Sequence, residues 1–337
     1  MVRNALKRGA LLTAANWQIV VVQGVADSIF RLLVAIPLIG GAFLAALLVD
    51  RDLWTLFGGG LGVAATTIAG ELSARPAALT AFAAAFATMA VGGSILVFLV
   101  KGGSASILAA ADRMAGPIER PPLRIASINR AAQFSIEAFS SGASALGRRF
   151  VALGLWLIIA YALSGGLFAV GMLQAFRSLA PSIPMAAWTA IVVLALLAGA
   201  AWVAAINLIY VVTQAVIAVT GRGPFGSLRS ALTFVRAERR KVGRAFGVVL
   251  FLYALATGLS LLAAAGLGLI AFVPVAGLAV IPIQLGAAFF RSLLNQFLGL
   301  TALVAYLTLY RSWAVSSGSQ AGAAAAVDSA FISELES

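Results

Sequence analysis

The sequence predicts an all-α integral membrane protein with about six transmembrane helices, arranged as three hairpin units with interfacial amphipathic helices. Hydrophobic residues make up 62% of the 337 residues, and charged residues make up only 10%, whereas about 25% of the residues in soluble domains are charged. The mean hydropathy of +1.05 agrees with this. A soluble fold of this length could not bury so much apolar surface, whereas a lipid bilayer accepts it.

The balance of charge is strongly basic and also fits a membrane protein. The chain has 23 Lys and Arg against 11 Asp and Glu, a formal net charge of +12. These basic residues lie between apolar segments, as the positive-inside rule predicts, so we expect no nucleic-acid partner. The chain has no Cys and no His, which excludes disulfides, Ser-His-Asp triads, His-ligated haem and ordinary zinc sites. We therefore expect no cofactor, no metal site and no catalytic residues.

The N-terminal 30 residues begin basic and turn apolar, without a clear small-x-small cleavage site of a signal peptide. Asp27 and Arg31 lie four residues apart, so they share a helix face and can form an ion pair. From Arg31 to Asp50 the chain runs 19 residues, which is about 28 Å of helix and close to the thickness of a bilayer core. We therefore predict the first span at residues 32–49. Arg31 then lies at the inner interface, and the preceding segment lies along or dips into the inner leaflet.

The second and third spans flank a long polar segment. Residues 50–75 carry charges and a glycine run, which favours an outer loop with some interfacial helix, and the second span is predicted at 76–100. Residues 101–149 hold seven basic residues and are too polar to cross, so we predict that they are cytoplasmic. The third span is predicted at 150–176. Within the polar segment, an amphipathic helix is indicated by apolar residues every three to four positions: Ile125, Ile128, Ala132, Ile136 and Phe139.

The fourth span, residues 185–220, leads into a second basic segment, residues 221–244. Gly221, Gly223 and Gly226 match the G-x-G-x-x-G pattern, but a dinucleotide site needs a preceding strand. We interpret the run as the break between the span and an interfacial helix. An apolar stripe beside a basic stripe is typical of a helix that lies on a membrane. The apolar stripe is Phe225, Leu228, Leu232 and Val235. The basic stripe, our candidate site for lipid headgroups, is Arg229, Arg236, Arg240 and Arg244.

The last apolar region can be divided in two ways, because residues 245–290 contain no charge. In the first division, a fifth span covers 245–269, an irregular outer turn covers 272–284 and a sixth span covers 286–310. In the second division, the uncharged stretch holds two full spans, which makes seven and places the C-terminus outside. The six-span division agrees better with the distribution of basic residues.

The predicted topology follows from that distribution. With six spans, 18 Lys and Arg lie on the inner side and 4 lie on the outer side, with Arg31 at the interface. Such a bias favours two cytoplasmic termini and a bacterial inner membrane. Residues 1–311 then form one polytopic transmembrane domain, and residues 312–337, which lack Lys and Arg, form a flexible cytoplasmic tail. The three hairpin units share one plan, which reflects either an internal repeat or the ordinary rhythm of such proteins.

Several polar residues fall inside or at the ends of the predicted spans. In membrane segments, such side chains either hold helices together or line a path for a substrate, and the sequence leaves both alternatives open. Three of them share one face of the fourth span, and two share a face of the last span. The candidate intramembrane residues are Asp27, Arg31, Asn207, Tyr210, Gln214, Arg291 and Asn295.

The second basic segment and the last span carry a resemblance to a known group of proteins. The run from Gly223 to Arg236, Gly-Pro-Phe-Gly-Ser-Leu-Arg-Ser-Ala-Leu-Thr-Phe-Val-Arg, is followed by basic residues and a span, and the last span closes with Ala-Tyr-Leu-Thr-Leu-Tyr-Arg at Arg311. This pattern resembles uncharacterised bacterial multipass proteins related to the membrane domain of some glycerophosphodiester phosphodiesterases. The resemblance covers roughly residues 212–311. It implies a six-helix bundle with interfacial helices, and it supplies no catalytic residues.

These observations lead to one preferred function and one alternative. We expect a non-enzymatic multipass membrane protein that organises lipid or partner proteins through its basic interfacial helices. The alternative is a transporter or permease-like protein with a polar path between helices near Tyr210 and Gln214, and a membrane-embedded enzyme comes third. The expected partners are membrane lipids, with anionic lipids, a protein partner and a second copy of the chain as open alternatives.

Overall fold

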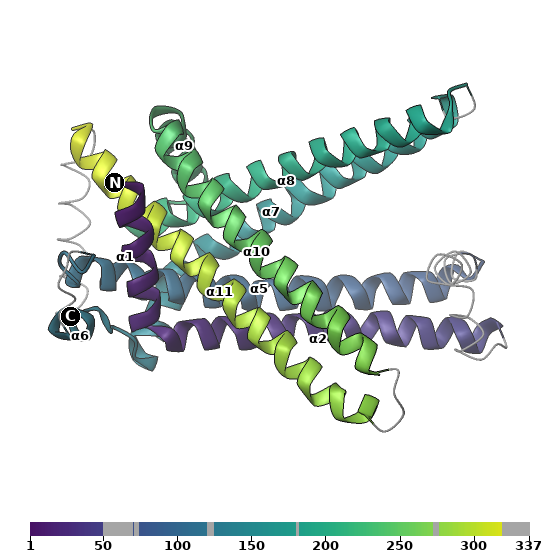
Figure 1. The fold of residues 1–337 in the computed structure, drawn as a ribbon, viewed down its shortest axis with the longest axis horizontal. Helices are drawn as coiled ribbons and strands as arrows, with labels where there is room; N and C mark the ends of the chain where they lie inside the picture. Colours follow the sequence, from purple (N-terminus) through teal and green to yellow (C-terminus); the bar gives the residue numbers. More distant parts are fainter. Residues whose placement is uncertain (50–69, 71–73, 120–124, 180–181, 272–275, 319–337) are drawn as a thin grey trace.

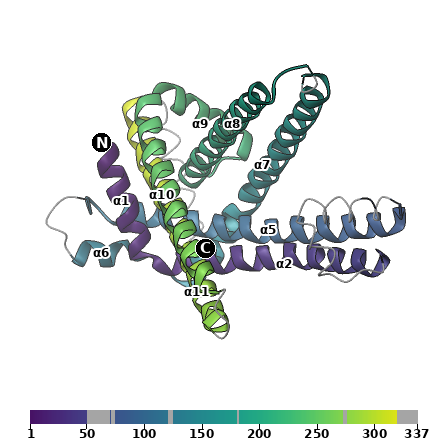
Figure 2. The same cartoon turned by 45° about the vertical axis from the view of Figure 1, so that its right-hand side comes forward.

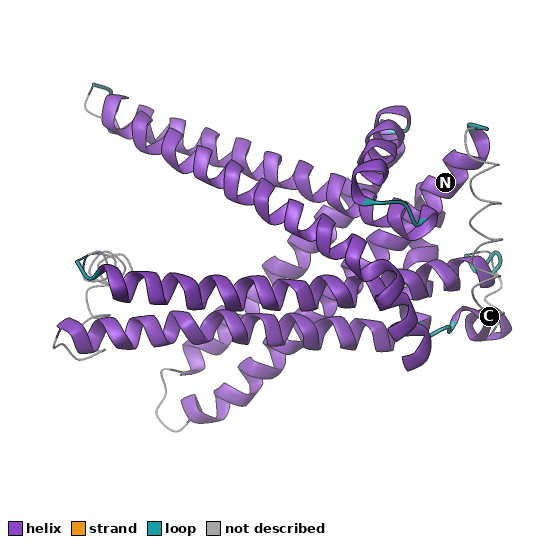
Figure 3. Cartoon of the chain, turned by 180° about the vertical axis from the view of Figure 1, so that it is seen from behind, coloured by secondary structure: helices purple, strands orange, loops and turns teal. Residues whose placement is uncertain are grey.

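The computed structural model describes residues 1–49, 70, 74–119, 125–179, 182–271 and 276–318, and this part of the chain contains helices and turns but no strand (Figure 3). The all-α prediction is therefore confirmed. The helices are α1 (Val2–Ala15), α2 (Trp17–Val49), α5 (Pro76–Met114), α6 (Ile125–Ala131), α7 (Ile136–Leu179), α8 (Met185–Thr220), α9 (Pro224–Ala237), α10 (Arg239–Ala271) and α11 (Ala276–Ser316).

Within the described residues, six helices are long and apolar enough to cross a bilayer. The uncharged stretch 245–290 lies in α10 as far as Ala271 and in α11 from Ala276, so it holds the greater part of one candidate span and the start of the next rather than two full spans. The described part of the chain thus agrees with a six-span multipass protein. The candidate spans are Trp17–Gly41, Leu79–Met114, Ile136–Leu179, Met185–Thr220, Arg239–Gly268 and Pro282–Ser316.

The six long helices form three pairs that meet at one end of the molecule (Figure 1). The pairs are α2 with α5, α7 with α8, and α10 with α11, as the three predicted hairpin units require. In Figure 2 the α7–α8 pair rises away from the α2–α5 pair, and α10–α11 crosses the α2–α5 pair. The short helices α1, α6 and α9 lie where the pairs meet, together with the start of the chain and the end of α11. We call this the convergent end and the opposite side the divergent end.

The buried core lies at the convergent end. Its large, fully buried side chains come from every described helix except α6, and they include Leu12, Ile19, Leu108, Phe150 and Tyr306. By contrast, none of the most apolar stretch of α8 is buried within the protein. A helix that is apolar on all sides and unburied is suited to lipid contact. The divergent arms therefore offer lipid-facing surface, and the convergent end supplies the tertiary structure.

Several helices run past the predicted span boundaries. The segment before Arg31 forms α1, which ends at Ala15, and the start of α2, which runs without a break from Trp17 through the predicted first span. In addition, α5 continues 14 residues beyond the predicted end at residue 100, and α7 starts 14 residues before 150. Polar side chains do not unwind a helix, so α5 and α7 continue beyond the predicted ends of the spans. The fourth span agrees with its predicted bounds, because Gly221 ends α8 in a left-handed conformation at φ 59°.

One predicted turn and one predicted helix also need correction. The turn expected at 272–284 is shorter, since α11 begins at Ala276 and continues through Pro282. The amphipathic helix expected from Ile125 to Phe139 is interrupted, because α6 ends at Ala131 and α7 begins at Ile136. Most of the predicted outer loop at 50–75 and of the tail at 312–337 lies outside the described residues.

One buried asparagine explains the interruption. The Asn16 side chain has no solvent exposure, and its amide donates hydrogen bonds to the carbonyl oxygens of Leu12 (2.9 Å) and Ala131 (2.8 Å). Its side-chain oxygen accepts a hydrogen bond from the backbone N–H of Gln133 (2.8 Å). These bonds satisfy backbone groups that would otherwise be orphaned at the ends of α1 and α6. Asn16 therefore fixes the α1–α2 joint and the α6–α7 break to each other.

Glycines bring α5 and α7 into close contact. A Cβ on Gly102 would lie 3.1 Å from the Cα atom of Gly147, which belongs to the backbone of the other helix. A Cβ on Gly103 would likewise collide with Phe139, and a Cβ on Gly154 would collide with the ring of Phe98. Small residues let helix backbones approach closely, which is a main source of attraction between membrane helices. This contact joins the first hairpin to the second.

We expect Gly102→Leu to force α5 away from α7 and to destabilise the protein by about 1–3 kcal/mol, the usual cost of overpacking a tight interface. The melting temperature of the detergent-solubilised protein measures this effect. Gly92→Leu is the matched control, because Gly92 lies on the same helix and a Cβ there would have no atom within 4 Å. Equal melting temperatures for the two variants would contradict the proposed contact.

Candidate functional site

A charge cluster at the convergent end joins three helices. The Asp112 side chain on α5 is only 4% exposed, and its two oxygens pair with Arg8 Nε of α1 at 2.5 Å and with Arg311 Nη1 of α11 at 2.6 Å. Arg8 also binds Glu119 Oε2 at 2.9 Å, and it donates to the backbone oxygens of Asp112 (2.6 Å) and Gly116. The cluster therefore satisfies a carboxylate that would be very costly to bury alone.

The Arg8 side chain is held in its charged form by this cluster. Burial lowers the pKa of the guanidinium, but hydrogen bonds and charge attraction from Asp112 and Glu119 outweigh burial, so the pKa is raised from its usual value. Close by, Gly9 lies against the backbone oxygen of Thr301, which leaves no room for a side chain between α1 and α11. The N-terminal helix is thus a docked part of the fold.

None of the residues in the charge cluster was among the functional candidates predicted from the sequence. In the sequence, Arg8 and Arg311 counted only among the basic residues that set the predicted topology. Asp112 had no predicted role. One signal is present in the sequence, because Asp112 follows the apolar run Ile107–Ala111, where a lone carboxylate needs a partner. The identity of that partner cannot be read from the sequence, since Arg8 and Arg311 are 104 and 199 residues away.

The four arginines of the predicted basic stripe are all exposed. None of them has an ion pair or a side-chain hydrogen bond within the described residues, whereas the neighbouring Lys241 pairs with Glu238 at 2.8 Å. The expected single row is split, because α9 ends at Ala237 and α10 begins at Arg239. We call the set the basic corner: Arg229 and Arg236 on α9, with Arg240 and Arg244 on α10.

The inward face of α9 differs from the predicted apolar stripe. The buried positions are Ser227, Ala231 and Phe234, whereas Phe225 is exposed and packs edge-on against Trp156. Phe234 fits between Tyr310 and Trp313 of α11, with ring centroids 5.5 Å from each. The stripe prediction was shifted because small residues at 227 and 231 allow α9 to pack closely on its neighbours.

The predicted intramembrane polar residues differ in the contacts they make. Asp27 and Arg31 form the expected ion pair at 2.7 Å. Tyr161 of α7 donates a hydrogen bond to Asn207 of α8 at 2.7 Å, and the backbone oxygen of Asn295 accepts one from Tyr253 of α10 at 2.7 Å. Arg291 has no partner within the described residues.

A small polar cavity lies beside Lys101, which was predicted to begin the cytoplasmic segment. Its ammonium group sits over the rings of Phe98 (5.8 Å) and Tyr210 (5.5 Å). Tyr210 and Gln214 are buried, and the Tyr210 hydroxyl and the Gln214 Nε2 have no hydrogen-bond partner in the described part. The cavity has a volume of about 50 Å³, enough for one or two waters. Its polar lining comes from three helices: Gln23, Asp27, Lys101 and Gln296.

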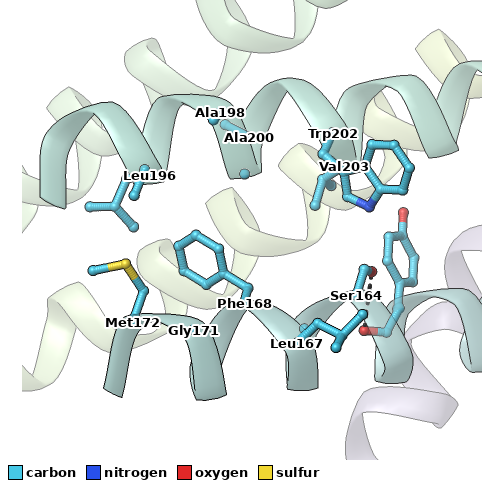
Figure 4. Close-up of a pocket in the computed structure, with 14 residues that line it drawn as sticks. Ser164, Leu167, Phe168, Gly171, Met172, Leu196, Ala198, Ala200, Trp202 and Val203 are labelled. Atoms are coloured by element: carbon cyan, nitrogen blue, oxygen red, sulfur yellow. Dashed lines mark hydrogen bonds between the residues drawn. The ribbon is translucent and has the colours of Figure 1, made fainter. Parts of the chain in front are cut away.

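The larger cavities are apolar. One of them, about 740 Å³, lies between α7 and α8, with Phe168, Met172 and Leu196 facing into it (Figure 4). The hydroxyl of Ser164 in its wall donates to the carbonyl oxygen of Ala160 at 2.6 Å, so it offers no free donor. Another cavity, about 340 Å³, lies between α8, α10 and α11. Such linings suit lipid chains rather than polar substrates.

The described residues contain no group of three or more acidic, His or Cys side chains that could hold a metal ion. Comparisons of the chain with protein-family models, with curated proteins and with solved structures found no match. The resemblance carried by residues 212–311 therefore stays a prediction. The features that bear on function are the charge cluster, the basic corner and the cavities.

We expect Asp112→Asn to destabilise the protein by about 3 kcal/mol, because it leaves the largely buried guanidinium of Arg311 without a counter-charge and Arg8 with Glu119 alone. The melting temperature in detergent, together with protease cleavage near the N-terminus, measures whether α1 undocks. Glu238→Gln is the control, because it breaks a more exposed pair that contributes about 0–1 kcal/mol. If the two variants lose the same small stability, the charge cluster does not hold the helices together.

Proposed function

We propose that the protein is a non-enzymatic membrane module that organises anionic lipids, or partner proteins, through the basic corner. The observation that carries this proposal is the contrast between two sets of arginines at the convergent end. Arg8 and Arg311 form ion pairs with Asp112. The four arginines of the basic corner are exposed, and their side chains have no partner within the described residues. Each basic residue near an anionic leaflet contributes about 1 kcal/mol of attraction.

The orientation belongs to the same proposal. With an even number of spans, the two ends of the described chain lie on the same side, and the basic corner lies there with them (Figure 1). The positive-inside rule then favours a cytoplasmic position for that side and for both termini. We take the membrane to be the bacterial inner membrane, whose cytoplasmic leaflet would supply the anionic headgroups.

Transport is the second candidate, and one observation favours it. The cavity beside Lys101 brings ionisable side chains of α2 and α5 together with Gln296 of α11, and intramembrane ionisable residues often mark ion or substrate paths. Its volume of about 50 Å³ suits bound water better than an organic substrate. The larger cavities are lined mainly by apolar side chains and contain no charged side chain, so we rank transport below lipid organisation.

We expect the double variant Arg236→Gln with Arg240→Gln to lose roughly tenfold or more in affinity for anionic lipid, because two charges are removed. The measurement is the amount of phosphatidylglycerol that co-purifies, read by mass spectrometry of the intact complex. Arg177→Glu is the matched control, since it removes the same two units of net charge at the divergent end of α7. Unchanged lipid content in the double variant would refute the lipid form of the proposal.

The absence of native Cys allows a clean accessibility experiment on orientation and transport. We expect a membrane-impermeant thiol reagent to label Ser317→Cys only from the cytoplasm and Ser178→Cys only from outside, in intact cells and inverted vesicles. Gln296→Cys should be labelled from neither side. The reverse pattern at the first two positions would overturn the orientation, and labelling at position 296 would favour transport.

A further inference from the structure

A third apolar cavity lies directly beneath α9. Its volume is about 440 Å³, and its walls come from α7, α8 and α9, including Leu153, Ile206, Ile209 and Leu228. Tyr210 and Thr213 also line it, but the Thr213 hydroxyl donates to the carbonyl oxygen of Ile209 at 2.7 Å. The cavity lies within the usual size range of ligand sites, about 300–1,000 Å³. Its lining matches the chemistry of a hydrocarbon chain.

Large aromatic side chains surround the entrance of this cavity. Trp156, Trp202 and Phe225 all line it, and they remain 50%, 59% and 64% exposed. The rings of Trp156 and Phe225 meet edge-on, with centroids 5.2 Å apart. Tryptophan favours the boundary between acyl chains and headgroups. Trp156 and Phe225 lie together at the α9 end of the cavity, whereas Trp202 lies near the middle of α8, so we take the α9 end to be the depth at which an acyl chain joins its headgroup.

Basic side chains lie beside the cavity where a headgroup would sit. Arg149 Nη1 lies 3.4 Å from the position of a Cβ on Gly221, so the α7 arginine reaches the α8–α9 joint. Arg149 is one helical turn from the lining residue Leu153. Arg229 is four residues after Phe225, so the two share a face of α9. Arg222 lies at the joint itself. The side chains of these three arginines have no partner within the described residues.

We propose that this cavity holds one acyl chain of an anionic phospholipid, with its phosphate between Arg149, Arg222 and Arg229. The inference rests on the proposed function, because it specifies where one lipid is held at the basic end of the protein. A hydrocarbon cavity beside converging cations complements an amphiphile whose head is negative. The bound lipid bridges α7 to the α8–α9 joint, so it supports the helix that carries half of the basic corner.

The test uses Trp156 and Trp202 as reporters at the cavity entrance. The full chain is placed in phosphatidylcholine vesicles, in which either phosphatidylglycerol or phosphatidylcholine carries brominated chains that quench nearby tryptophan. We expect brominated phosphatidylglycerol to quench more strongly than brominated phosphatidylcholine. Trp156→Phe should remove much of that difference, because it deletes a reporter at the site. Equal quenching by the two lipids would overturn the proposal.

Two kinds of variant separate the headgroup contacts from the chain site. Arg149→Gln with Arg229→Gln should weaken the preference for phosphatidylglycerol by roughly 20- to 30-fold, whereas the Lys versions should keep most of it. Ala160→Phe, which fills the cavity, should abolish quenching of Trp156 by either lipid. Ala195→Phe is the control, because Ala195 lines only the cavity between α7 and α8. Melting temperatures identify any variant that fails to fold.

The outcomes also separate this inference from the proposed function. If Arg236→Gln with Arg240→Gln reduces co-purified anionic lipid while Ala160→Phe leaves the quenching difference intact, the basic corner binds lipid but this cavity does not hold its chain. That result overturns the inference alone. If quenching depends on Arg149 and Ala160, the site is supported, even where the basic corner adds nothing to lipid content.

Discussion

Asp112 pairs with two arginines from opposite ends of the sequence, and the convergent end of the molecule depends on this arrangement. A carboxylate with 4% exposure is stable only when it is paired and hydrogen-bonded, and its partners lie on α1 and α11. The first helix, the second span and the last span are thereby held at one point. Asn16 and the glycine contact of α5 with α7 then extend the packed region to α6 and to the second hairpin.

The fold therefore divides into two regions that are stabilised in different ways. At the convergent end, buried polar groups, close glycine contacts and the rings around Phe234 specify one arrangement of helices. At the divergent end, apolar helices have few protein neighbours, and their hydrogen bonds are satisfied within each helix. The features that could recognise another molecule, namely the basic corner and the cavity under α9, both belong to the packed region.

Hydropathy predicted the six spans because lipid imposes a length and a composition that are visible in one sequence. The bounds of α8 were predicted well, since Pro184 and Gly221 interrupt the helix, whereas Lys101 and Arg149 lie inside helices that continue. The exposed arginines on α9 and α10 were also predicted, because amphipathic spacing is local. The Arg8–Asp112–Arg311 cluster and the role of Asn16 could not be predicted, because they join residues more than a hundred positions apart with no shared pattern.

The spreading of the three hairpins has a consequence for the two leaflets of the bilayer. At the convergent end the protein occupies one packed cross-section, whereas at the divergent end three separate arms displace lipid over a broader area (Figures 1 and 2). Because the most apolar stretch of α8 is not buried by protein, we expect lipid to surround the divergent arms. The angles between the arms would then respond to lateral pressure in the bilayer, which would couple the protein's shape to membrane curvature and thickness.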